Sequence, residues 1–293
     1  MKKICFILTF FSNKSPLKFW KEKKFPLYFN YFINTFDYNK EIDLKIFTDI
    51  SFQEYSFINE HIKFYPMSFS AFNKKASKAL GLKINPDKPY KVCDLRPSYG
   101  IIFEEHLKKY DFWGYCDTDM IMGNLRRFIS DDLLNNFEAI TSGSGANNPH
   151  YPNGYMMLYE NCGKMNNLYS KSKDYRWIFE DKKNYRFDEN GGDRNIVSMC
   201  DVIEQEQIKI CHVPGLVHND GGSFNNNRPW LYVWDKGQLV DTLTDSEVGS
   251  LHLMKSKSRS NFQLNYLNLR NEALANSFYI SAEGIFPHSP NFK

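Results

Sequence analysis

Short apolar runs alternate with amphipathic stretches along the first half of the chain. Residues 3–11, 42–50 and 62–69 are runs rich in aromatic and β-branched residues, which predict buried strands. Residues 26–38 and 72–82 have the apolar spacing of helices. This β-α-β alternation predicts an α/β fold in which a mostly parallel central sheet is flanked by helices.

The alternation becomes less regular beyond residue 90. We expect a helix with a proline-containing start over 94–110, a strand that ends in D-T-D, a helix over 124–137 and a strand over 138–145. The second half has helical material near 161–180 and 193–206, a strand at 208–213, a Gly/Asn loop at 219–227 and aromatic residues at 230–234. Because no repeat or low-complexity linker interrupts the 293 residues, we expect one compact domain.

Composition narrows the class of protein. Aromatic residues make up 16% of the chain, which argues against disorder, and a net charge of +3 is too small to indicate nucleic-acid binding. The six cysteines form no C-x-x-C pair, which predicts reduced thiols in a cytoplasmic protein. The start, MKKICFILTFF, lacks a small-residue cleavage site and predicts a first strand rather than a signal peptide.

The stretch FWGYCDTDMIMGNL, residues 112–125, places two carboxylates directly behind a buried strand. Residues two apart on a strand share a face, so Asp117 and Asp119 are expected to project together at the strand's carboxyl end. Two close carboxylates repel each other, and a shared divalent cation removes that repulsion. The alternative is a polar turn in which Asp119 or Asn124 caps the next helix.

The segment YKVCDLRPSYGIIFEEHLKKYDFWGYCDTDMIMGNLRRFI resembles the core of GT-A-fold glycosyltransferases, and most closely a bacterial family from surface-polysaccharide loci. The resemblance implies a nucleotide-sugar-binding half, residues 1–140, and an acceptor-side half with a C-terminal closing segment, residues 141–293. It also implies that Asp119 binds Mn²⁺ or Mg²⁺ directly, while Asp117 reaches the metal or the ribose. The cation would act on the diphosphate of a nucleotide-sugar donor, expected to be a UDP-sugar.

The resemblance further implies that His252, in GSLHLMKSKSR, completes the metal shell. A histidine beside Leu251 and Leu253 is otherwise a structural residue. Lys255 and Lys257 follow directly, and their charges could neutralise the same diphosphate. The chain lacks the full H-x-x-G-x-x-K pattern of related retaining galactosyltransferases, so which cation has this role is left open.

Several other polar residues are candidates for nucleotide contacts. Asp49 ends the second predicted strand, where it could bond the base or ribose or be a plain turn residue. In CDLRPSYG, Asp94 and Arg96 precede a predicted helix. Arg96 could clamp phosphate through two parallel hydrogen bonds, or Asp94 and Arg96 could form a local surface pair; we expect the donor site.

The stretch YRFDENGGDRNIV, residues 185–197, is the candidate for the acceptor-side acid. An inverting transferase needs Asp188 or Glu189 as the general base for the acceptor hydroxyl, whereas a retaining one needs it only for orientation. The alternative is a charged turn before a helix that is capped at Asp193. The Gly-rich stretch 141–155 could bind the donor sugar or acceptor, or be a surface loop.

A lysine-rich stretch near the N-terminus is a candidate membrane contact. Basic residues with aromatic neighbours suit an anionic bilayer surface, where a lipid-linked acceptor would reside, although a solvated face is the usual explanation for a charge run. The residues concerned are Lys14, Lys18, Lys21, Lys23 and Lys24, interleaved with Phe19, Trp20 and Phe25.

Together these features predict a metal-dependent glycosyltransferase that acts on a nucleotide-sugar and a glycan acceptor, without nucleic acid, in the cytoplasm and with peripheral membrane contact. The alternatives are a sugar-nucleotide nucleotidyltransferase, or a non-catalytic nucleotide- or glycan-binding protein of the same fold. A nucleotidyltransferase should carry a Gly-rich loop after the first strand, and TFFSNKSPLKFW contains no glycine.

Overall fold

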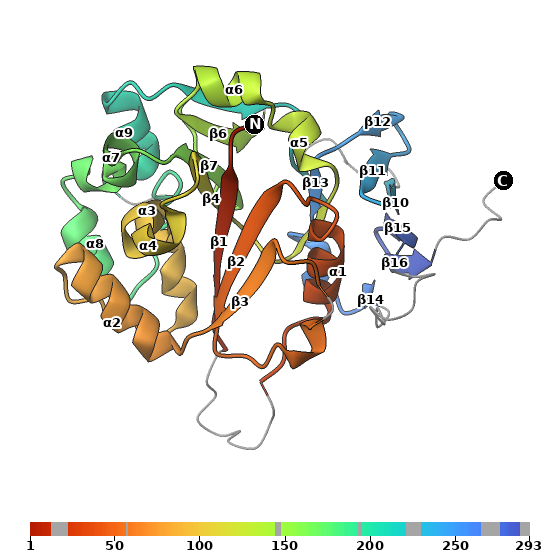
Figure 1. Cartoon of the computed structure of the whole chain (residues 1–293), viewed down its shortest axis with the longest axis horizontal. Coiled ribbons are helices and arrows are strands. Elements are labelled where there is room, and N and C mark those ends of the chain that lie inside the picture. Colours follow the sequence, from red (N-terminus) through yellow and green to blue (C-terminus); the bar gives the residue numbers. More distant parts are fainter. Residues whose placement is uncertain are drawn as a thin grey trace. The chain divides into compact units, whose positions relative to one another are not determined.

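The computed structural model describes residues 1–12, 23–56, 58–143, 148–192, 195–220, 230–264 and 276–287 (Figure 1). The chain forms two compact units, each made of three separate stretches. Unit 1 contains Met1–Lys24, Glu41–Cys116 and Asp131–His212, and unit 2 contains Phe25–Lys40, Asp117–Ser130 and Val213–Lys293. The units therefore interleave in sequence and do not follow the halves 1–140 and 141–293; a single domain stays a prediction.

Unit 1 is built on a seven-stranded sheet of order β3-β2-β1-β4-β7-β6-β8. Strands β3, β2, β1 and β4 run parallel, while β7 is antiparallel to both β4 and β6. This arrangement confirms the predicted α/β class with a mostly parallel sheet. The strands are β1 (Ile4–Phe10), β2 (Ile42–Thr48), β3 (Ile62–Pro66), β4 (Phe112–Cys116), β6 (Ala139–Ser142), β7 (Met156–Glu160) and β8 (Ile210–Val213).

Helices cover the sheet face that carries the odd-numbered side chains of β1, and Cys5 and Ile7 are buried against them in the largest core cluster (Figure 1). The helices of unit 1 are η1 (Gln53–Tyr55), α2 (Phe69–Leu80), η2 (Pro89–Ser98), α3 (Tyr99–Ile102), α4 (Glu104–Leu107), α6 (Asp131–Asn136), α7 (Gly163–Asn166), η3 (Leu168–Lys171), α8 (Tyr175–Glu180) and α9 (Met199–Gln205). The core of unit 1 therefore lies between the sheet and the helices that contribute to this cluster, among them α2, α3, α8 and α9.

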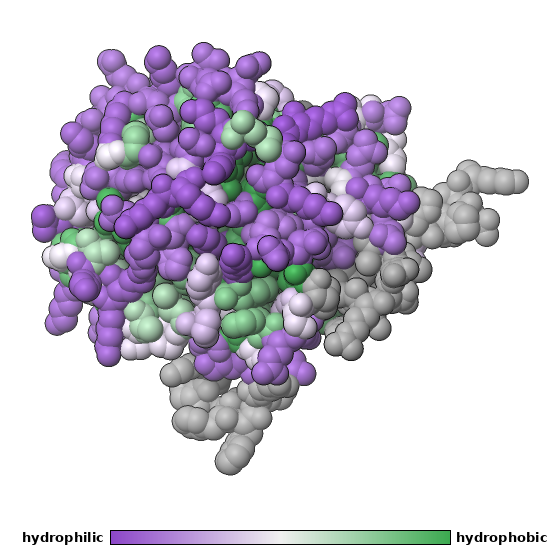
Figure 2. All heavy atoms as spheres, viewed as in Figure 1, coloured by the Kyte–Doolittle hydropathy of each residue, from purple (hydrophilic) through white to green (hydrophobic). Residues whose placement is uncertain are grey.

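Helix α2 shows how local sequence sets these elements. The Ser68 side chain caps its first turn by accepting a hydrogen bond from the Ala71 amide at 3.0 Å. Phe72 is buried, whereas Lys74 is exposed, and Figure 2 shows hydrophilic and hydrophobic side chains mixed on the part of this face where α2 lies. Gly81 ends the helix with φ = 64°, a left-handed conformation that glycine adopts at little cost.

Two predicted helices are broken. Residues 94–110 form the end of η2, then α3 and α4. Pro97 lacks an amide hydrogen and lies in η2, so regular helix begins only after it, and a second break follows at Phe103. Residues 124–137 form α5 (Leu125–Phe128) and α6, separated at Ile129, whose side chain is fully buried.

Unit 2 contains helix α1 (Leu27–Phe36) and two small sheets, most of which the apolar pattern did not predict. One sheet has the order β5-β13-β9, with β5 (Met120–Met122), β9 (His218–Asn219) and β13 (Ser250–His252). The other has the order β12-β11-β10-β15-β16-β14. Its strands are β10 (Leu231–Asp235), β11 (Gln238–Asp241), β12 (Ser246–Glu247), β14 (Gln263–Leu264), β15 (Ser277–Ser281) and β16 (Gly284–Pro287).

A buried cluster in unit 2 joins α1 to both sheets. Tyr31 of α1 packs edge-on against Phe278, which stacks on Trp234. The Trp234 indole donates a hydrogen bond to the Met122 carbonyl at 2.8 Å, and Thr35 accepts one from the Met122 amide at 3.0 Å. Strand β5 is thus held from two directions, which fixes the residues that directly precede it.

Candidate metal centre

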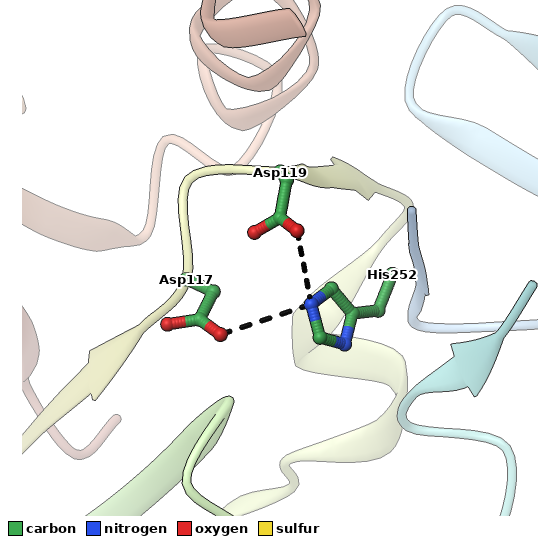
Figure 3. A group of neighbouring side chains, drawn as sticks. All are labelled: Asp117, Asp119 and His252. Atoms are coloured by element: carbon green, nitrogen blue, oxygen red, sulfur yellow. Dashed lines mark ion pairs between the residues drawn. The ribbon is translucent and has the colours of Figure 1, made fainter. Parts of the chain in front are cut away.

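The two aspartates lie in the turn between β4 and β5. Strand β4 ends at Cys116 and β5 begins at Met120, so Asp117 and Asp119 do not continue the strand as the alternation suggested. Both carboxylates nevertheless point the same way, toward His252 on β13 (Figure 3). The turn therefore brings the two carboxylates together, as a continued strand was expected to do.

Strand pairing brings His252 to the aspartates although many residues separate them in sequence. Strand β13 is antiparallel to β5, with His252 opposite Met120, and the Leu253 amide donates to the Asp119 carbonyl at 2.8 Å. His252 Nε2 lies 3.2 Å from Asp119 Oδ2 and 3.7 Å from Asp117 Oδ2 (Figure 3). The structure therefore brings together all three residues that the sequence proposed as metal ligands.

The three side chains form a donor set that fits a hard divalent cation. One ligand atom from each of Asp117, Asp119 and His252 lies within 4.8 Å of the other two. Side chains of Asp119 and His252 are only 4% exposed, whereas that of Asp117 is 27% exposed. Two carboxylates and one imidazole suit Mn²⁺, and carboxylate oxygen also suits Mg²⁺. The more open Asp117 side leaves access for a substrate.

Asn219 orients the imidazole from its other side. Strand β9 runs parallel to β13 with Asn219 opposite His252, and Asn219 Oδ1 lies 3.1 Å from His252 Nδ1. Because an amide oxygen only accepts, Nδ1 carries a proton, and Nε2 is the ring nitrogen that faces the aspartates. Sequence reasoning missed this residue, since Asn219 begins a stretch that reads as a Gly/Asn loop.

A lysine from the segment after β13 enters the same site. The Lys257 ammonium donates a hydrogen bond to Asp119 Oδ2. Burial alone would raise the pKa of Asp119, but the hydrogen bond and charge of His252 and the charge of Lys257 outweigh burial and hold this pKa well below its ordinary value. Asp119 is therefore ionised in a strongly cationic setting.

Asp220, which the sequence analysis did not identify, fixes the turn that carries these cations. Its side chain is nearly fully buried and accepts hydrogen bonds from the backbone amides of Lys255 at 3.0 Å and Ser256 at 2.6 Å. These contacts lead into η4 (Ser256–Ser258), which places Lys257. Asp220 acts on the backbone of the cationic segment and not on the site itself.

The pKa of Tyr28, in α1, is affected by the negative charges of the two aspartates. Burial is the main cause that raises its pKa to about 12, and the charges of Asp119 and Asp117 raise it further. Its hydroxyl stays protonated at neutral pH and contacts the Thr118 side chain between the two aspartates. The D-T-D turn is thus supported by α1 as well as by β13.

Asp49 lies in unit 1 at the end of β2, and protein groups already engage its carboxylate. The Ser12 amide and hydroxyl donate to it at 2.8 and 2.9 Å, and the Lys23 ammonium lies at 2.6 Å. Burial raises its pKa, but the hydrogen bonds and charge of Lys23 and the bonds from Ser12 lower it below the ordinary value. Whether Asp49 also contacts a nucleotide stays a prediction.

Asp94 is placed differently from the prediction. It is fully buried, and its carboxylate accepts from Lys91 Nζ at 2.8 Å, the Tyr185 amide at 2.8 Å and the Phe187 amide at 2.9 Å. A surface pair with Arg96 does not fit this burial, and whether Asp94 also supports the donor site stays a prediction. Asp94 has a structural role that anchors the segment around Tyr185, and a proline-interrupted stretch gave no hint of this long-range contact.

Arg96 and the acids of the 185–197 stretch form a second cluster within unit 1. Arg96 Nη1 donates to the Gly154 carbonyl at 2.5 Å and lies 3.7 Å from Asp188 Oδ2. Glu189 is held by Arg186, whose Nε lies at 2.8 Å. The structure therefore joins Arg96 to a predicted acceptor-side acid, a pairing that sequence spacing could not reveal.

The proposed membrane stretch falls mainly outside the described residues, which exclude Lys14, Lys18 and Lys21. Lys23 is paired with Asp49, and Phe25 is buried and stacked on Phe29 with ring centroids 3.9 Å apart. Among the described residues, no helix is long and apolar enough to span a bilayer. All six cysteines are described, and each is a free thiol.

The fold and site define an α/β protein with a two-aspartate, one-histidine group capable of holding a metal. Residues 23–289 match a family described as a family of unknown function (DUF6625), and the chain belongs to this family. No curated protein sequence matches the chain.

Among solved structures, the chain is similar to the galactosyltransferase LgtC in complex with donor and acceptor sugar analogs, with 11% identity, a TM-score of 0.42 and 86% of each chain covered. It is also similar to mouse xyloside xylosyltransferase 1 in its apo form, with 9% identity, a TM-score of 0.44, and 88% of this chain and 99% of that chain covered. Likenesses at this level carry no inference about the reaction.

Proposed function

We propose that this protein is a metal-dependent glycosyltransferase that moves a sugar from a nucleoside diphosphate to a hydroxyl of a bacterial surface glycan. The observation that carries the proposal is the convergence of Asp117, Asp119 and His252 within 4.8 Å, with Lys257 at the same carboxylate. A set of metal ligands beside the Lys257 ammonium suits a substrate with a diphosphate, because the metal ion that they would hold and the ammonium can both neutralise its charge. UDP is the nucleotide that the sequence resemblance implies.

Asp117, Asp119 and His252 would hold Mn²⁺ or Mg²⁺ in this site. The bound cation would supply Lewis-acid stabilisation of charge on the leaving diphosphate. Lys257 brings a second positive charge to the same place, and Lys255 lies two residues before it on the segment that Asp220 anchors. A diphosphate oxygen could replace Asp119 as the hydrogen-bond acceptor of Lys257, since an ammonium donates up to three bonds.

Asp188 and Glu189 are the proposed acceptor-side acids, and the structure distinguishes their surroundings. Glu189 is paired with the Arg186 guanidinium at 2.8 Å, which stabilises its charged form. Asp188 lies farther from its cation, 3.7 Å from Arg96 Nη1. Either acid stays a candidate to deprotonate or orient an acceptor hydroxyl, Asp188 from a more buried position than Glu189.

The test is a screen of nucleotide-sugars for metal-dependent release of free nucleoside diphosphate. With the right donor, Asp119→Asn should lower turnover more than tenfold, a loss of about 1.4 kcal/mol of transition-state stabilisation, while thermal melting stays near wild type. Asp235→Asn removes an exposed carboxylate in the same unit and serves as the matched control.

Other outcomes separate the alternatives. Pyrophosphate release from a nucleoside triphosphate and a sugar 1-phosphate would identify a nucleotidyltransferase. Metal-dependent UDP binding without turnover of any donor would identify a non-catalytic nucleotide-binding protein. Full activity of the Asp119→Asn variant would show that this carboxylate does not hold the metal.

A further inference from the structure

Unit 1 contains a cavity of about 950 Å³, and Asp49, a candidate nucleotide contact, is one of its lining residues. The lining includes residues from Ser68 to Asn73 at the start of α2, residues from Lys83 to Pro89, and Ser12, Lys23 and Asp49. We call it the α2 cavity. Its volume lies at the upper end of the ~300–1,000 Å³ range of small-molecule sites, so a sugar unit with a charged substituent would fit.

Asn73 places a buried polar group on the wall of this cavity. Its side chain is 8% exposed, and within the described part of the chain its Oδ1 atom has no hydrogen-bond partner. Burying an amide oxygen without a partner is unfavourable, so its burial at the lining of a cavity points to a ligand that supplies a donor. A sugar hydroxyl is such a donor.

The charged groups around the α2 cavity leave a positive excess. The acids of its lining already have cationic partners, since Asp49 is paired with Lys23 and Asp87 lies 2.9 Å from Lys182. The remaining lining cations have no ion-pair partner among the described residues; they are Lys74, Lys83 and Lys88. Three ammonium groups around one cavity favour an anionic ligand.

The twelve-residue helix α2 adds to this field. The helix dipole places partial positive charge at its N-terminus, where Ser68 and Ser70 line the cavity. Among the described residues, the Ser68 side chain accepts a hydrogen bond from the Ala71 amide and from no other amide of the first turn. Serine hydroxyls beside such a terminus can donate hydrogen bonds to a phosphate or carboxylate oxygen.

The Lys83–Pro89 segment is held in place by the protein itself. Ser77 of α2 accepts a hydrogen bond from the Ile84 amide at 3.0 Å, and Ile84 is buried. The Lys83 amide donates to Glu180 at 2.9 Å. Because the backbone that bears Lys83 is fixed at both sides, the cavity is formed without a ligand, and binding would cost little reorganisation.

We propose that the α2 cavity is a binding site for an anionic sugar, either a sugar phosphate or a sugar acid. The ligand's hydroxyls would bond Asn73, and its phosphate or carboxylate would lie among Lys74, Lys83 and Lys88. The inference rests on the lining of unit 1 alone and is independent of the metal centre.

Isothermal titration of the full chain, in EDTA so that the metal centre stays metal-free, tests this site. Glucose 6-phosphate and glucuronate are the anionic probes, while glucose and inorganic phosphate each lack one half of the proposed chemistry. We expect one of the anionic sugars to bind with one site per chain and at least about tenfold more tightly than glucose or inorganic phosphate. Whichever of the two binds identifies the anionic group.

Two variants locate the site. Lys74→Gln, Lys83→Gln and Lys88→Gln combined should weaken binding of that sugar at least about tenfold. The control, Lys63→Gln, Lys78→Gln and Lys108→Gln combined, makes the same charge change at exposed lysines of unit 1 outside the cavity and should change affinity less than about twofold. Asn73→Asp, nearly isosteric but anionic, should also weaken binding.

Three results would overturn the proposal. Absence of saturable binding by both anionic sugars would show that no such site exists. If the control triple variant weakened sugar binding equally, the effect would come from the overall charge of the protein and not from this cavity. Displacement of the bound sugar by UDP in EDTA would assign the cavity to the nucleotide donor instead of a separate anionic sugar.

Discussion

Asn219 Oδ1 accepts a hydrogen bond from His252 Nδ1 at 3.1 Å, and the parallel pairing of β9 with β13 sets the two residues opposite each other. The bond assigns the proton to Nδ1 and leaves Nε2 as the atom that faces Asp117 and Asp119. Histidine ligands of metals are commonly oriented by such a second hydrogen bond. Asn219 is therefore a positioning residue for the proposed metal centre.

Asn219→Leu should weaken Mn²⁺ binding by roughly 10–100-fold, because the imidazole loses the partner that fixes its tautomer and orientation. Asn219→Asp keeps an acceptor for Nδ1–H and should keep the affinity. The measurement is the free Mn²⁺ signal in electron paramagnetic resonance during titration. In a His252→Ala background, Asn219→Leu should have little further effect; an undiminished effect there would mean that Asn219 does not act through the histidine.

Asp220→Ala should destabilise the cationic segment after β13. The amides of Lys255 and Ser256 would lose their acceptor, at a cost of about 1–3 kcal/mol in the free energy of unfolding. Amide exchange of residues 254–258 should accelerate by more than in Asp235→Ala, which removes an exposed carboxylate. Unchanged exchange in this segment would exclude the anchoring role of Asp220.

The sequence predicted the metal ligands and missed the residues that support them, for a physical reason. Asp117, Asp119 and His252 belong to residue types whose pattern indicates chemistry. Asn219 and Asp220 act through strand register and backbone amides, which depend on how β9, β13 and β5 align after folding. Such contacts leave no periodicity in the sequence.

The fold was likewise predictable only in part. The parallel strands of unit 1 are continuous apolar runs, and the pattern identified them. The strands of unit 2 are mostly short, with β12 and β14 only two residues long, so alternation has too few positions to show. Residues 94–110 have the apolar spacing of a helix, but Pro97 prevents one continuous helix over the whole stretch.

Asp94→Asn should reduce stability much more than a change at a surface ion pair. It would leave the Lys91 ammonium, which is itself buried, without a counter-charge, and removing one partner of a buried pair costs about 3–5 kcal/mol. Changing Lys91 and Asp94 together to methionine and asparagine should recover part of the loss, as measured by urea unfolding. If Asp94→Asn instead melts like wild type and loses nucleotide affinity, the residue belongs to the donor site.

The last prediction concerns the pH dependence that Asp49 gives to stability. Burial raises its pKa, but the Lys23 ammonium and the Ser12 donors outweigh burial, so the folded pKa lies below the unfolded value. A depressed carboxylate pKa contributes stability that is complete above the unfolded pKa, about 3.9, and is lost as pH falls through the folded pKa. Wild type should therefore exceed Asp49→Asn in free energy of unfolding by a constant amount above about pH 5. The difference should shrink below about pH 4, measured by urea titrations between about pH 2 and 7. Lys23→Gln should remove much of the same difference, since the two residues form one pair. A gap between wild type and Asp49→Asn that stays constant into acid would show that the Asp49 charge contributes nothing to folding.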